Sequence, residues 1–366
     1  MASTNFAALT ADQKLVWSRK LWQDARDAMF INRFMGTEQS SIIQRITELT
    51  KTEKGTEAII HLVADLVGDG VQGDNAREGA EEAMQSYNEK IQLDLISHGV
   101  KNTGKLSDQK TVIDFRTQSR DKLAYWLANR MDQLAFLTLA GIAYSFTNNG
   151  AARVDPTFPA LSFAADVSAP SANRHLRVDG AGLSAGNTAL LTATDTLTYA
   201  HIVDIMTEAK VRYIKPLMSG GKEFYMAFVR PEVLAQLKKD PDYQRAVVTG
   251  LPREMNNPFF SGAITTVDGL VIHDHRLVYN TKGAVAPNKW GAAGDVDGTR
   301  VSVCGSQALG MVDLGAPEWA EEDFEYKSQY GINIDKMFGF VKPKFGDIYS
   351  GGAVEDFGVL TVDVAI

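Results

Sequence analysis

Cysteine and histidine are scarce in this 366-residue sequence, which contains one cysteine, Cys304, and six histidines. A single cysteine excludes an intrachain disulfide framework and any multi-cysteine zinc site. We expect Cys304 to be a small, buried apolar side chain. Positive charge is also in short supply, because 37 lysines and arginines face 45 aspartates and glutamates and leave a net charge of −8. A dedicated binder of DNA or of anionic membranes needs concentrated positive charge, so the composition argues against both classes.

Long hydrophobic runs are missing as well. The most apolar stretch, Leu134 to Tyr144, is far shorter than the roughly 20 residues that cross a bilayer. The opening of the sequence lacks the basic region and the continuous apolar core of a secretory signal. We therefore expect a protein without a membrane span that is made in, and stays in, the cytosol of its host cell.

The remaining composition is ordinary, with 45% hydrophobic and 22% charged residues, and fits one large or two to three ordinary domains. Residues 1–50 read as helical pieces, because Trp17, Leu21 and Trp22 keep helical spacing and Asp12 is placed to cap the first turn. This segment has a net charge of +1. It is amphipathic, and packing on its own domain and packing on a neighbouring subunit both remain open.

Residues 51–104 have the pattern of a projecting hairpin. Two extended arms, Ala58 to Val63 and Ile91 to Leu95, enclose a long polar stretch that is punctuated by glycine. The segment contains ten acids and five bases, so its net charge is −5. More than half of the negative excess of the whole chain is therefore local to this hairpin.

A long helix is predicted from Ser107, which offers an N-cap, to about Leu139, because the sequence between them lacks glycine and proline. Such a helix would be about 50 Å long. Its first part, residues 105–130, has a net charge of +3. The six bases of that part are Lys105, Lys110, Arg116, Arg120, Lys122 and Arg130. A long helix with one apolar stripe needs a sheet or other helices across that stripe, so we expect a spine of the fold.

The second half of the chain alternates between loops, helices and strands without a regular βαβ series. Residues 147–190 are rich in glycine, alanine and serine and read as a long loop or insertion at a domain boundary. Helices are predicted at 198–211 and 231–238, and strands at 224–229, 270–272, 301–303 and 359–362, with a long alternating run at 324–345. The fold class predicted from this order is α+β.

One motif suggests a nucleotide site. Gly68, Gly70 and Gly73 satisfy the dinucleotide-binding pattern and follow a strand-like run. That site needs backbone amides and a positive helix N-terminus facing a pyrophosphate. Asp69 lies inside the loop and four more acids follow within ten residues, so their charges would repel the phosphates. We prefer turn glycines at the tip of an exposed hairpin, and keep a dinucleotide-binding enzyme as the alternative from a different class.

The other candidate motifs have simpler explanations. His273 and His275 share one face of a strand, but no third metal ligand is spaced nearby, so we interpret them as strand-end polar residues. The stretch 295–298 resembles a calcium loop with its glycine misplaced and reads as a turn. The acidic run 318–323 reads as a solvated face. With no catalytic constellation in the sequence, we expect no catalytic residues, no cofactor and no metal.

Several stretches, taken in order, resemble the major capsid proteins of tailed bacteriophages, in particular a podophage-like branch. They span nearly the whole chain: Gly55 to Glu57, Gly68 to Val71, Thr111 to Arg116, Lys122 to Leu127, Phe228 to Leu234 and Asp356 to Val359. The resemblance implies a Hong-Kong-97-type capsid fold. It implies an N-terminal arm at 1–50, an extended loop at 51–104, a peripheral domain at 105–195 with spine helix 107–139 and insertion 147–190, an axial domain at 196–310, and return strands to the peripheral domain at 311–366.

The function implied by the resemblance is a self-assembling subunit of the icosahedral head that encloses a double-stranded DNA genome. The expected partners are further copies of the chain in hexamers and pentamers, portal and scaffolding proteins, possible decoration proteins, and packaged DNA in weak, nonspecific contact. The expected location is the virion, after assembly in the bacterial cytoplasm. An encapsulin-like cargo shell of the same fold is the alternative within this class.

The charge pattern then suggests residues for contacts between subunits, because an extended loop of this fold lies over the adjacent subunit. The acidic candidates on the hairpin are Asp69, Asp74, Glu78, Glu81 and Glu82. The basic candidates on the spine helix are Arg116, Arg120 and Lys122. Single exposed ion pairs contribute only about 0–1 kcal/mol each, but repetition over many interfaces can set register and partner choice.

Overall fold

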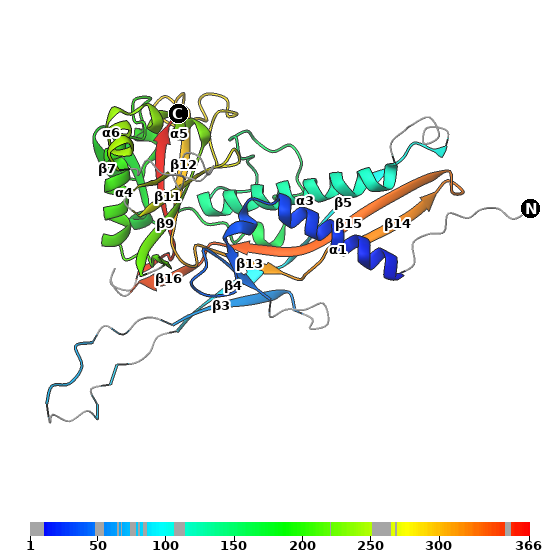
Figure 1. The fold of residues 1–366 in the computed structure, drawn as a ribbon, viewed down its shortest axis with the longest axis horizontal. Helices are drawn as coiled ribbons and strands as arrows, with labels where there is room; N and C mark the ends of the chain where they lie inside the picture. Colours follow the sequence, from blue (N-terminus) through cyan, green and yellow to red (C-terminus); the bar gives the residue numbers. More distant parts are fainter. Residues whose placement is uncertain are drawn as a thin grey trace, which may run out of the picture.

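The structure is a computed structural model. It describes residues 11–47, 55–63, 66, 68–73, 78–79, 81–82, 86–105, 114–219, 221–250, 265–267, 269–347 and 353–366. Figure 1 shows two regions side by side: a sheet flanked by short helices at the end that holds the C-terminus, and an elongated region of long helices and long strands. A two-stranded hairpin projects from the junction between them.

Two helices, α1 (Ala11–Ala28) and α3 (Phe115–Ala140), form one layer of the elongated region. The start of α3 differs from the prediction, because Asp114 has an extended backbone and caps a new helix by accepting a hydrogen bond from the Arg116 amide. The predicted N-cap, Ser107, lies outside the described residues. At 26 residues, α3 is about 39 Å long rather than the predicted 50 Å.

A six-stranded sheet lies against α1 and α3. Its main path runs β1-β2-β13-β15-β14, and β5 pairs with the other edge of β15. The strands are β1 (Met35–Gly36), β2 (Ile43–Ile46), β5 (Asp94–Lys101), β13 (Leu309–Asp313), β14 (Glu318–Phe324) and β15 (Gln329–Val341). The apolar stripes of both helices are buried against this sheet, and helix α1 packs on its own chain.

An eight-stranded sheet forms the second region, in the order β10-β11-β9-β12-β18-β6-β7, with β8 paired to β9. Its strands are β6 (His175–Asp179), β7 (Gly182–Ala185), β8 (Leu217–Ser219), β9 (Lys222–Val229), β10 (Thr265–Val267), β11 (Leu270–Asp274), β12 (Gly298–Cys304) and β18 (Val359–Ala365). The helices of this region are α4 (Tyr199–Val211), α5 (Pro231–Lys239) and α6 (Pro241–Gly250). Short 3-10 turns, η1 (Ile31–Phe34), η2 (Ser162–Ala164), η3 (Ala172–Arg174) and η4 (Thr188–Leu190), complete the connections.

Two expectations about this sheet are wrong. The segment 147–190 is not only a loop, because its residues His175–Asp179 form β6 inside the sheet. The final strand, β18, does not return to the spine helix region, because it pairs with β12 on one side and with β6 on the other. Both strands hold buried apolar residues of one core, and this burial places segments nearly 190 residues apart side by side.

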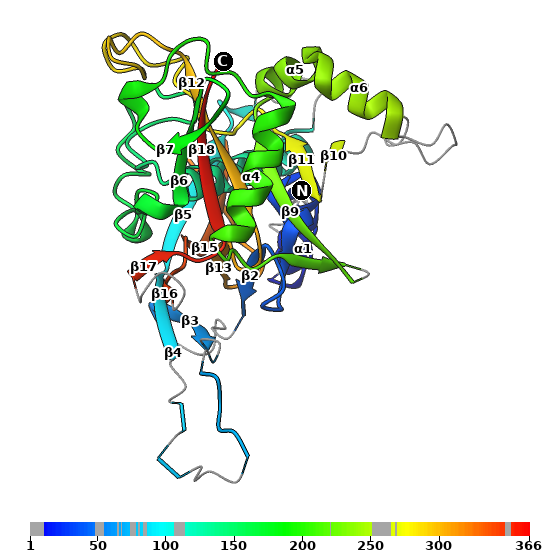
Figure 2. The same ribbon diagram turned by 90° about the vertical axis from the view of Figure 1, so that its left-hand side faces the viewer.

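The projecting hairpin is formed by β3 (Glu57–Val63) and β4 (Ser86–Gln92), which pair antiparallel. Its return arm ends earlier than predicted, because Leu95 already belongs to β5 of the six-stranded sheet. A small core fixes the base of the hairpin to its own chain, close to the strand pair β16 (Lys344–Asp347) and β17 (Ala353–Asp356). The described residues between β3 and β4 extend away from both large sheets (Figures 1 and 2).

Candidate interaction surfaces

The acidic candidates on the hairpin lie at the surface. Asp69, Glu78, Glu81 and Glu82 are all exposed, and Asp74 lies outside the described residues. Two of these carboxylates accept hydrogen bonds from turn amides: Glu82 from the amide of Gly68, and Glu81 from that of Gly79, both at 2.7 Å. These contacts are local, and they leave the acids on the outside of the projecting segment.

The same contacts weigh against the nucleotide alternative. A phosphate would need the backbone amides of this loop, yet the Gly68 amide donates to the Glu82 carboxylate. Gly70 and Gly73 have backbone φ angles of 74° and 62°, in the left-handed region that favours glycine in turns. Among the residues that can be described, no helix begins directly after this loop. The glycines therefore act as turn residues.

Two of the basic candidates on α3 already have partners within the chain. Arg116 contacts the Glu321 carboxylate at 3.1 Å and donates to the Tyr330 hydroxyl at 2.5 Å. Arg120 contacts the Asp121 carboxylate at 2.6 Å and that of Asp24 at 3.6 Å. Lys122 is exposed, and within the described part of the chain it forms no ion pair.

The contact with Arg116 corrects one sequence interpretation. The run 318–323 was expected to form a solvated face, but the side chain of Glu321 is only 3% exposed. Glu321 also accepts a hydrogen bond from the Trp319 indole at 2.8 Å. Alternation along β14 turns Trp319 and Glu321 toward the helices, while Glu318 and Glu322 point the other way.

The side of β5, β15 and β14 that faces away from the helices is uncovered in the described chain. Residues paired directly across antiparallel strands share a face, so the buried pair Trp319 and Ile334 marks the covered side. On the other side, Leu95 pairs with Met337, and these apolar side chains are 45% and 44% exposed. The charged residues on this side are Glu318, Glu322, Asp335 and Lys101. We call these six residues the sheet face.

The opposite side of the same region is the layer of α1 and α3 with the loop after β11. Five exposed bases lie on α1, in η1 and in the loop after β11: Arg19, Lys20, Arg26, Arg33 and Arg276. We call these five residues the basic helix face. Arg276 donates to the hydroxyl of the half-exposed Tyr125 on α3 at 2.7 Å, and this contact joins the loop to the helix layer.

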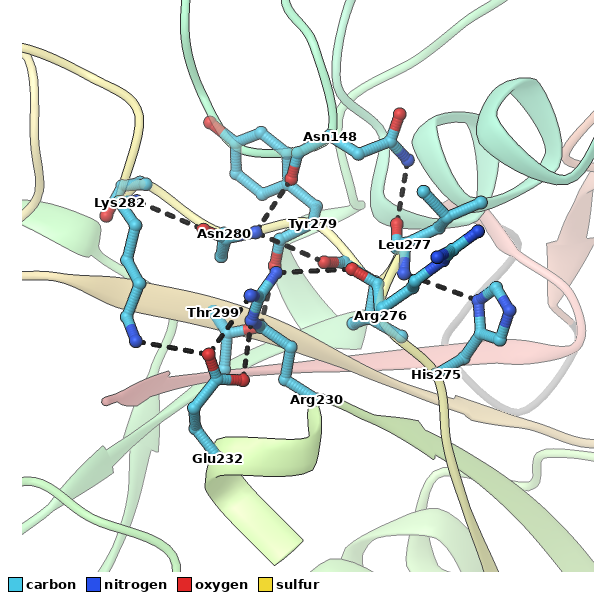
Figure 3. Close-up of polar contacts among 12 residues, drawn as sticks. Asn148, Arg230, Glu232, His275, Arg276, Leu277, Tyr279, Asn280, Lys282 and Thr299 are labelled. Carbon is cyan, nitrogen blue, oxygen red and sulfur yellow. Dashed lines mark hydrogen bonds and ion pairs between the residues drawn. The ribbon is translucent and has the colours of Figure 1, made fainter. Parts of the chain in front are cut away.

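A group of polar contacts joins the loop after β11 to the start of α5 (Figure 3). Arg230 and Lys282 both point at the Glu232 carboxylate, at 2.8 Å and 3.1 Å. Hydrogen bonding from Arg230 is the main cause that lowers the pKa of Glu232 to about 2. The Asn148 side chain donates to the Leu277 carbonyl at 2.7 Å and ties the same loop to the residues after α3. This group holds the two regions of the fold together.

The two histidines that had suggested a metal site, His273 and His275, belong to a cluster of aromatic rings at the end of β11. His275 stacks on Phe30 and Phe136, with ring centroids 4.3 Å and 5.1 Å apart, and His273 contacts Phe34 edge-on at 4.9 Å. Burial lowers the pKa of both histidines to about 4, with a further contribution from nearby arginines. In the parts of the chain with described positions, no group of three or more acid, histidine or cysteine side chains is placed to hold a metal ion.

Asp132 is an anchor that the sequence interpretation missed. It lies on the buried side of α3 and accepts hydrogen bonds from the amides of Phe30 and Ile31 at 3.0 Å and 3.1 Å. Burial raises its pKa to about 6 despite these two bonds. A lone acid within the apolar stripe of a helix was the available signal, because such a carboxylate needs a buried partner.

Two buried ion pairs join strands of the fold, and one of them also contacts the end of α3. Arg300 binds both oxygens of Asp363, at 2.7 Å and 3.1 Å, and donates to the Ala140 carbonyl at the end of α3 at 2.9 Å. Burial alone would raise the pKa of Asp363, but Arg300 and His175 outweigh it and hold the pKa below its ordinary value. Lys342 and Asp356 form a second pair at 2.9 Å, and both side chains are fully buried.

Cys304 is fully buried in β12, as predicted, and burial raises the pKa of its thiol, so the thiolate that a nucleophile needs is disfavoured. No helix within the described ranges is long and apolar enough to cross a membrane. The described residues therefore offer charged surfaces, apolar surfaces and buried contacts between the parts of the fold.

The chain matches a family model described as phage capsid protein over residues 5–366. It is 51% identical over 366 residues to the major capsid protein of Pseudomonas phage KPP25, with 99% of this chain and 97% of that protein covered. The capsid of Ralstonia phage GP4 has a similar structure, with a TM-score of 0.77, 24% identity, and coverage of 100% of this chain and 98% of that one. The capsid of cyanophage Pam1 matches with a TM-score of 0.70 at 20% identity over 99% of both chains.

Proposed function

The chain belongs to the phage capsid protein family, and we infer from this membership that it is a shell-forming major capsid protein. The predicted α+β fold of the Hong-Kong-97 type is confirmed by the structural neighbours. The observation that carries the function is the match to a major capsid protein over nearly the full length of both chains. The described residues support this function, because they form exposed charged and apolar surfaces and polar contacts that hold the two regions of the fold together.

Finer features of the function follow from the same inference. We propose that the subunit assembles with copies of itself into hexamers and pentamers of an icosahedral head around double-stranded DNA. Portal, scaffolding and possible decoration proteins are the proposed further partners, and the host cytoplasm is the proposed site of assembly. We also propose that the chain is not an enzyme and uses no cofactor.

The hairpin supports the proposed contact between subunits. Its acids are exposed on a segment that extends away from the rest of its own chain (Figure 2). We propose that Glu81, Glu82 and the neighbouring acids rest on α3 of an adjacent subunit. Arg116 and Arg120 are engaged within their own chain, so Lys122 is the base that remains for this contact.

Negative-stain microscopy of the recombinant full-length protein tests the function. We expect closed shells from the native sequence, and a small oligomer that binds dinucleotide would contradict the proposal. In the double variant Glu81→Lys and Glu82→Lys we expect few closed shells, because the reversed charges repel Lys122 of the neighbour. The matched control reverses two exposed acids elsewhere, Glu38→Lys and Asp295→Lys, and should assemble normally. Normal shells from the hairpin variant would remove the proposed contact while leaving the function intact.

A further inference from the structure

The two sides of the elongated region differ in charge. The sheet face has three acids and one base, and the basic helix face has five bases. Two exposed acids, Asp27 and Asp274, are close in sequence to these bases, so the five bases and these two acids together have a net charge of +3. A positive face is unusual for this chain, because the whole sequence has a net charge of −8.

The five bases form a track along α1 and past its end. Arg19 and Arg26 are seven residues apart, which is about two helical turns, so they lie on one side of α1 about 10 Å apart. Arg33 follows in η1 after the helix. Arg33 lies over the Phe30 ring, and that ring stacks on His275, the neighbour of Arg276 in the sequence. The track therefore continues from α1 to the loop after β11.

These bases are not paired with acids in the described ranges, although Arg276 donates to the Tyr125 hydroxyl and Arg33 lies over the Phe30 ring. None of the five forms an ion pair with another residue in the described ranges, whereas Arg116, Arg120, Arg230 and Arg300 all do. The opposite side of α1 is apolar, because Leu21, Trp22 and Ala25 are buried against the sheet. Exposed positive charge that is not neutralised by an acidic side chain in the described ranges is available for a polyanion.

We propose that the basic helix face binds the phosphate backbone of nucleic acid, through charge and without reading sequence. The proposal rests on the proposed function and extends it, because it assigns the contact with the enclosed genome to five named residues. The proposal requires that this face line the interior of a closed shell. A row of exposed basic side chains can contact neighbouring phosphates of the nucleic-acid backbone. Such contacts provide binding that does not depend on base sequence.

The same physics explains why the contact is weak. A face with five bases neutralises only a few phosphates, and the remaining surface of an acidic chain repels them. Each phosphate contact contributes about −0.9 to the slope of log affinity against log salt concentration. Binding should be measurable at about 50 mM salt and largely lost at about 200 mM salt. A genome held in this way can enter and leave the shell.

The test measures the affinity of full-length subunits for a labelled 30-base-pair duplex by fluorescence anisotropy between 25 and 200 mM salt. The test variant is Arg19→Gln, Lys20→Gln and Arg26→Gln on α1. The matched control is Lys222→Gln, Lys238→Gln and Lys239→Gln, which removes three exposed positive charges from the other region. Each triple removes at least one base from the last turn of a helix, Arg26 from α1 and Lys238 with Lys239 from α5, so the loss of favourable contact with the helix dipole is partly matched.

We expect the α1 triple to weaken duplex binding about tenfold at 50 mM salt and to reduce the magnitude of the salt slope by up to about 2.7. The control triple should leave both quantities near the native values. Equal effects of the two triples, or no duplex binding by the native chain at 25 mM salt, would overturn the proposal. Stronger binding of poly-glutamate than of duplex to the same face would also overturn it and indicate an acidic protein partner.

Shell formation by each variant, scored by negative-stain microscopy, separates this proposal from the proposed function. If the native chain forms shells and the α1 triple retains full duplex affinity, the assignment of the nucleic-acid face is wrong and the function stands. If the native chain forms no shells, the proposed function itself fails, whatever the affinity for DNA.

Discussion

Charged side chains in this protein occur in two settings that can be compared directly. At the joint between the eight-stranded sheet and α3, Arg300 and Asp363 are buried and bind each other through two contacts. On the hairpin, Glu81 and Glu82 are exposed and accept hydrogen bonds from the turn amides of Gly79 and Gly68. The sequence contains both sets as ordinary acids and bases, and only their surroundings distinguish them.

The difference indicates which charges act within the subunit and which act between subunits. A buried charge without a partner costs several kcal/mol, so a buried pair fixes how two parts of the fold join. An exposed charge costs the folded chain almost nothing and is free to act on another molecule. The comparison predicts large effects on subunit stability for the joint, smaller ones for partly buried groups, and almost none for the hairpin.

The largest effect on stability is expected at the joint. Asp363→Asn keeps the shape of the side chain and leaves the Arg300 charge buried without its partner, so we expect a loss of about 3–5 kcal/mol in the free energy of unfolding. Urea unfolding of the unassembled subunit measures the change. The matched control, Lys289→Met, breaks a partly exposed ion pair with Asp297 of similar length, at 2.7 Å, and should cost less, because both of its side chains keep some contact with water.

A second variant keeps this prediction testable if Asp363→Asn does not fold. Replacing both partners, Arg300→Met with Asp363→Leu, removes the buried charges together, and we expect it to be more stable than the single variant. A single variant as stable as the Lys289→Met control would show that the buried pair does not fix the joint, and the comparison between the two settings would fail.

An intermediate effect is expected from the two histidines of the aromatic cluster. The pKa of His273 and of His275 is about 4 in the folded chain, below the ordinary value of 6.5, because burial disfavours the charged ring. As pH falls from about 6.5 toward 4, the unfolded chain binds protons that the folded chain does not, so stability is lost in this window. The nearby Arg33 and Arg276 act in the same direction, and Asp274 opposes them.

Asp132 opposes this loss, because its folded pKa of about 6 lies above the ordinary 3.8 and protonation of the folded chain adds stability as pH falls through 6. Two histidines against one aspartate leave a net loss. Urea midpoints measured from pH 7.5 to 4.5 should therefore fall, and His273→Gln with His275→Gln should reduce that fall. The control His61→Gln alters an exposed hairpin histidine and should retain the native slope. An unchanged slope in the double variant would contradict burial as the cause.

Local elements of the fold could be predicted closely from the sequence. Helix α4 begins after the predicted position 198, where Thr198 and His201 form a capping box, and α5 begins at Pro231, because both starts are set by neighbouring residues. The pairing of β6 with β18 could not be predicted, since it joins His175 to Thr361 through a shared core rather than through any local pattern. Neighbouring residues in the sequence determine where these helices start, whereas burial of apolar side chains determines which strands pair.

The interaction surfaces divide in the same way. Exposure of the hairpin acids followed from the polarity and glycine content of their segment, and four of the five are exposed at described positions. The engagement of Arg116 did not follow, because its partner Glu321 is 205 residues away and looks like part of an acidic run. A charge pattern along the sequence therefore identifies candidates, and only the folded chain shows which of them already have a partner.

The smallest effect on subunit stability is expected for the hairpin. Glu81→Lys with Glu82→Lys should change the free energy of unfolding by less than about 0.5 kcal/mol, because both side chains are exposed and substitutions at such positions have little effect. Urea unfolding of unassembled subunits gives this value beside the yield of closed shells from the same preparation. Loss of shells with unchanged stability would place the action of these acids between subunits. A loss of stability close to that of Asp363→Asn would mean that the hairpin charges act within the fold, and the distinction between the two settings would no longer hold.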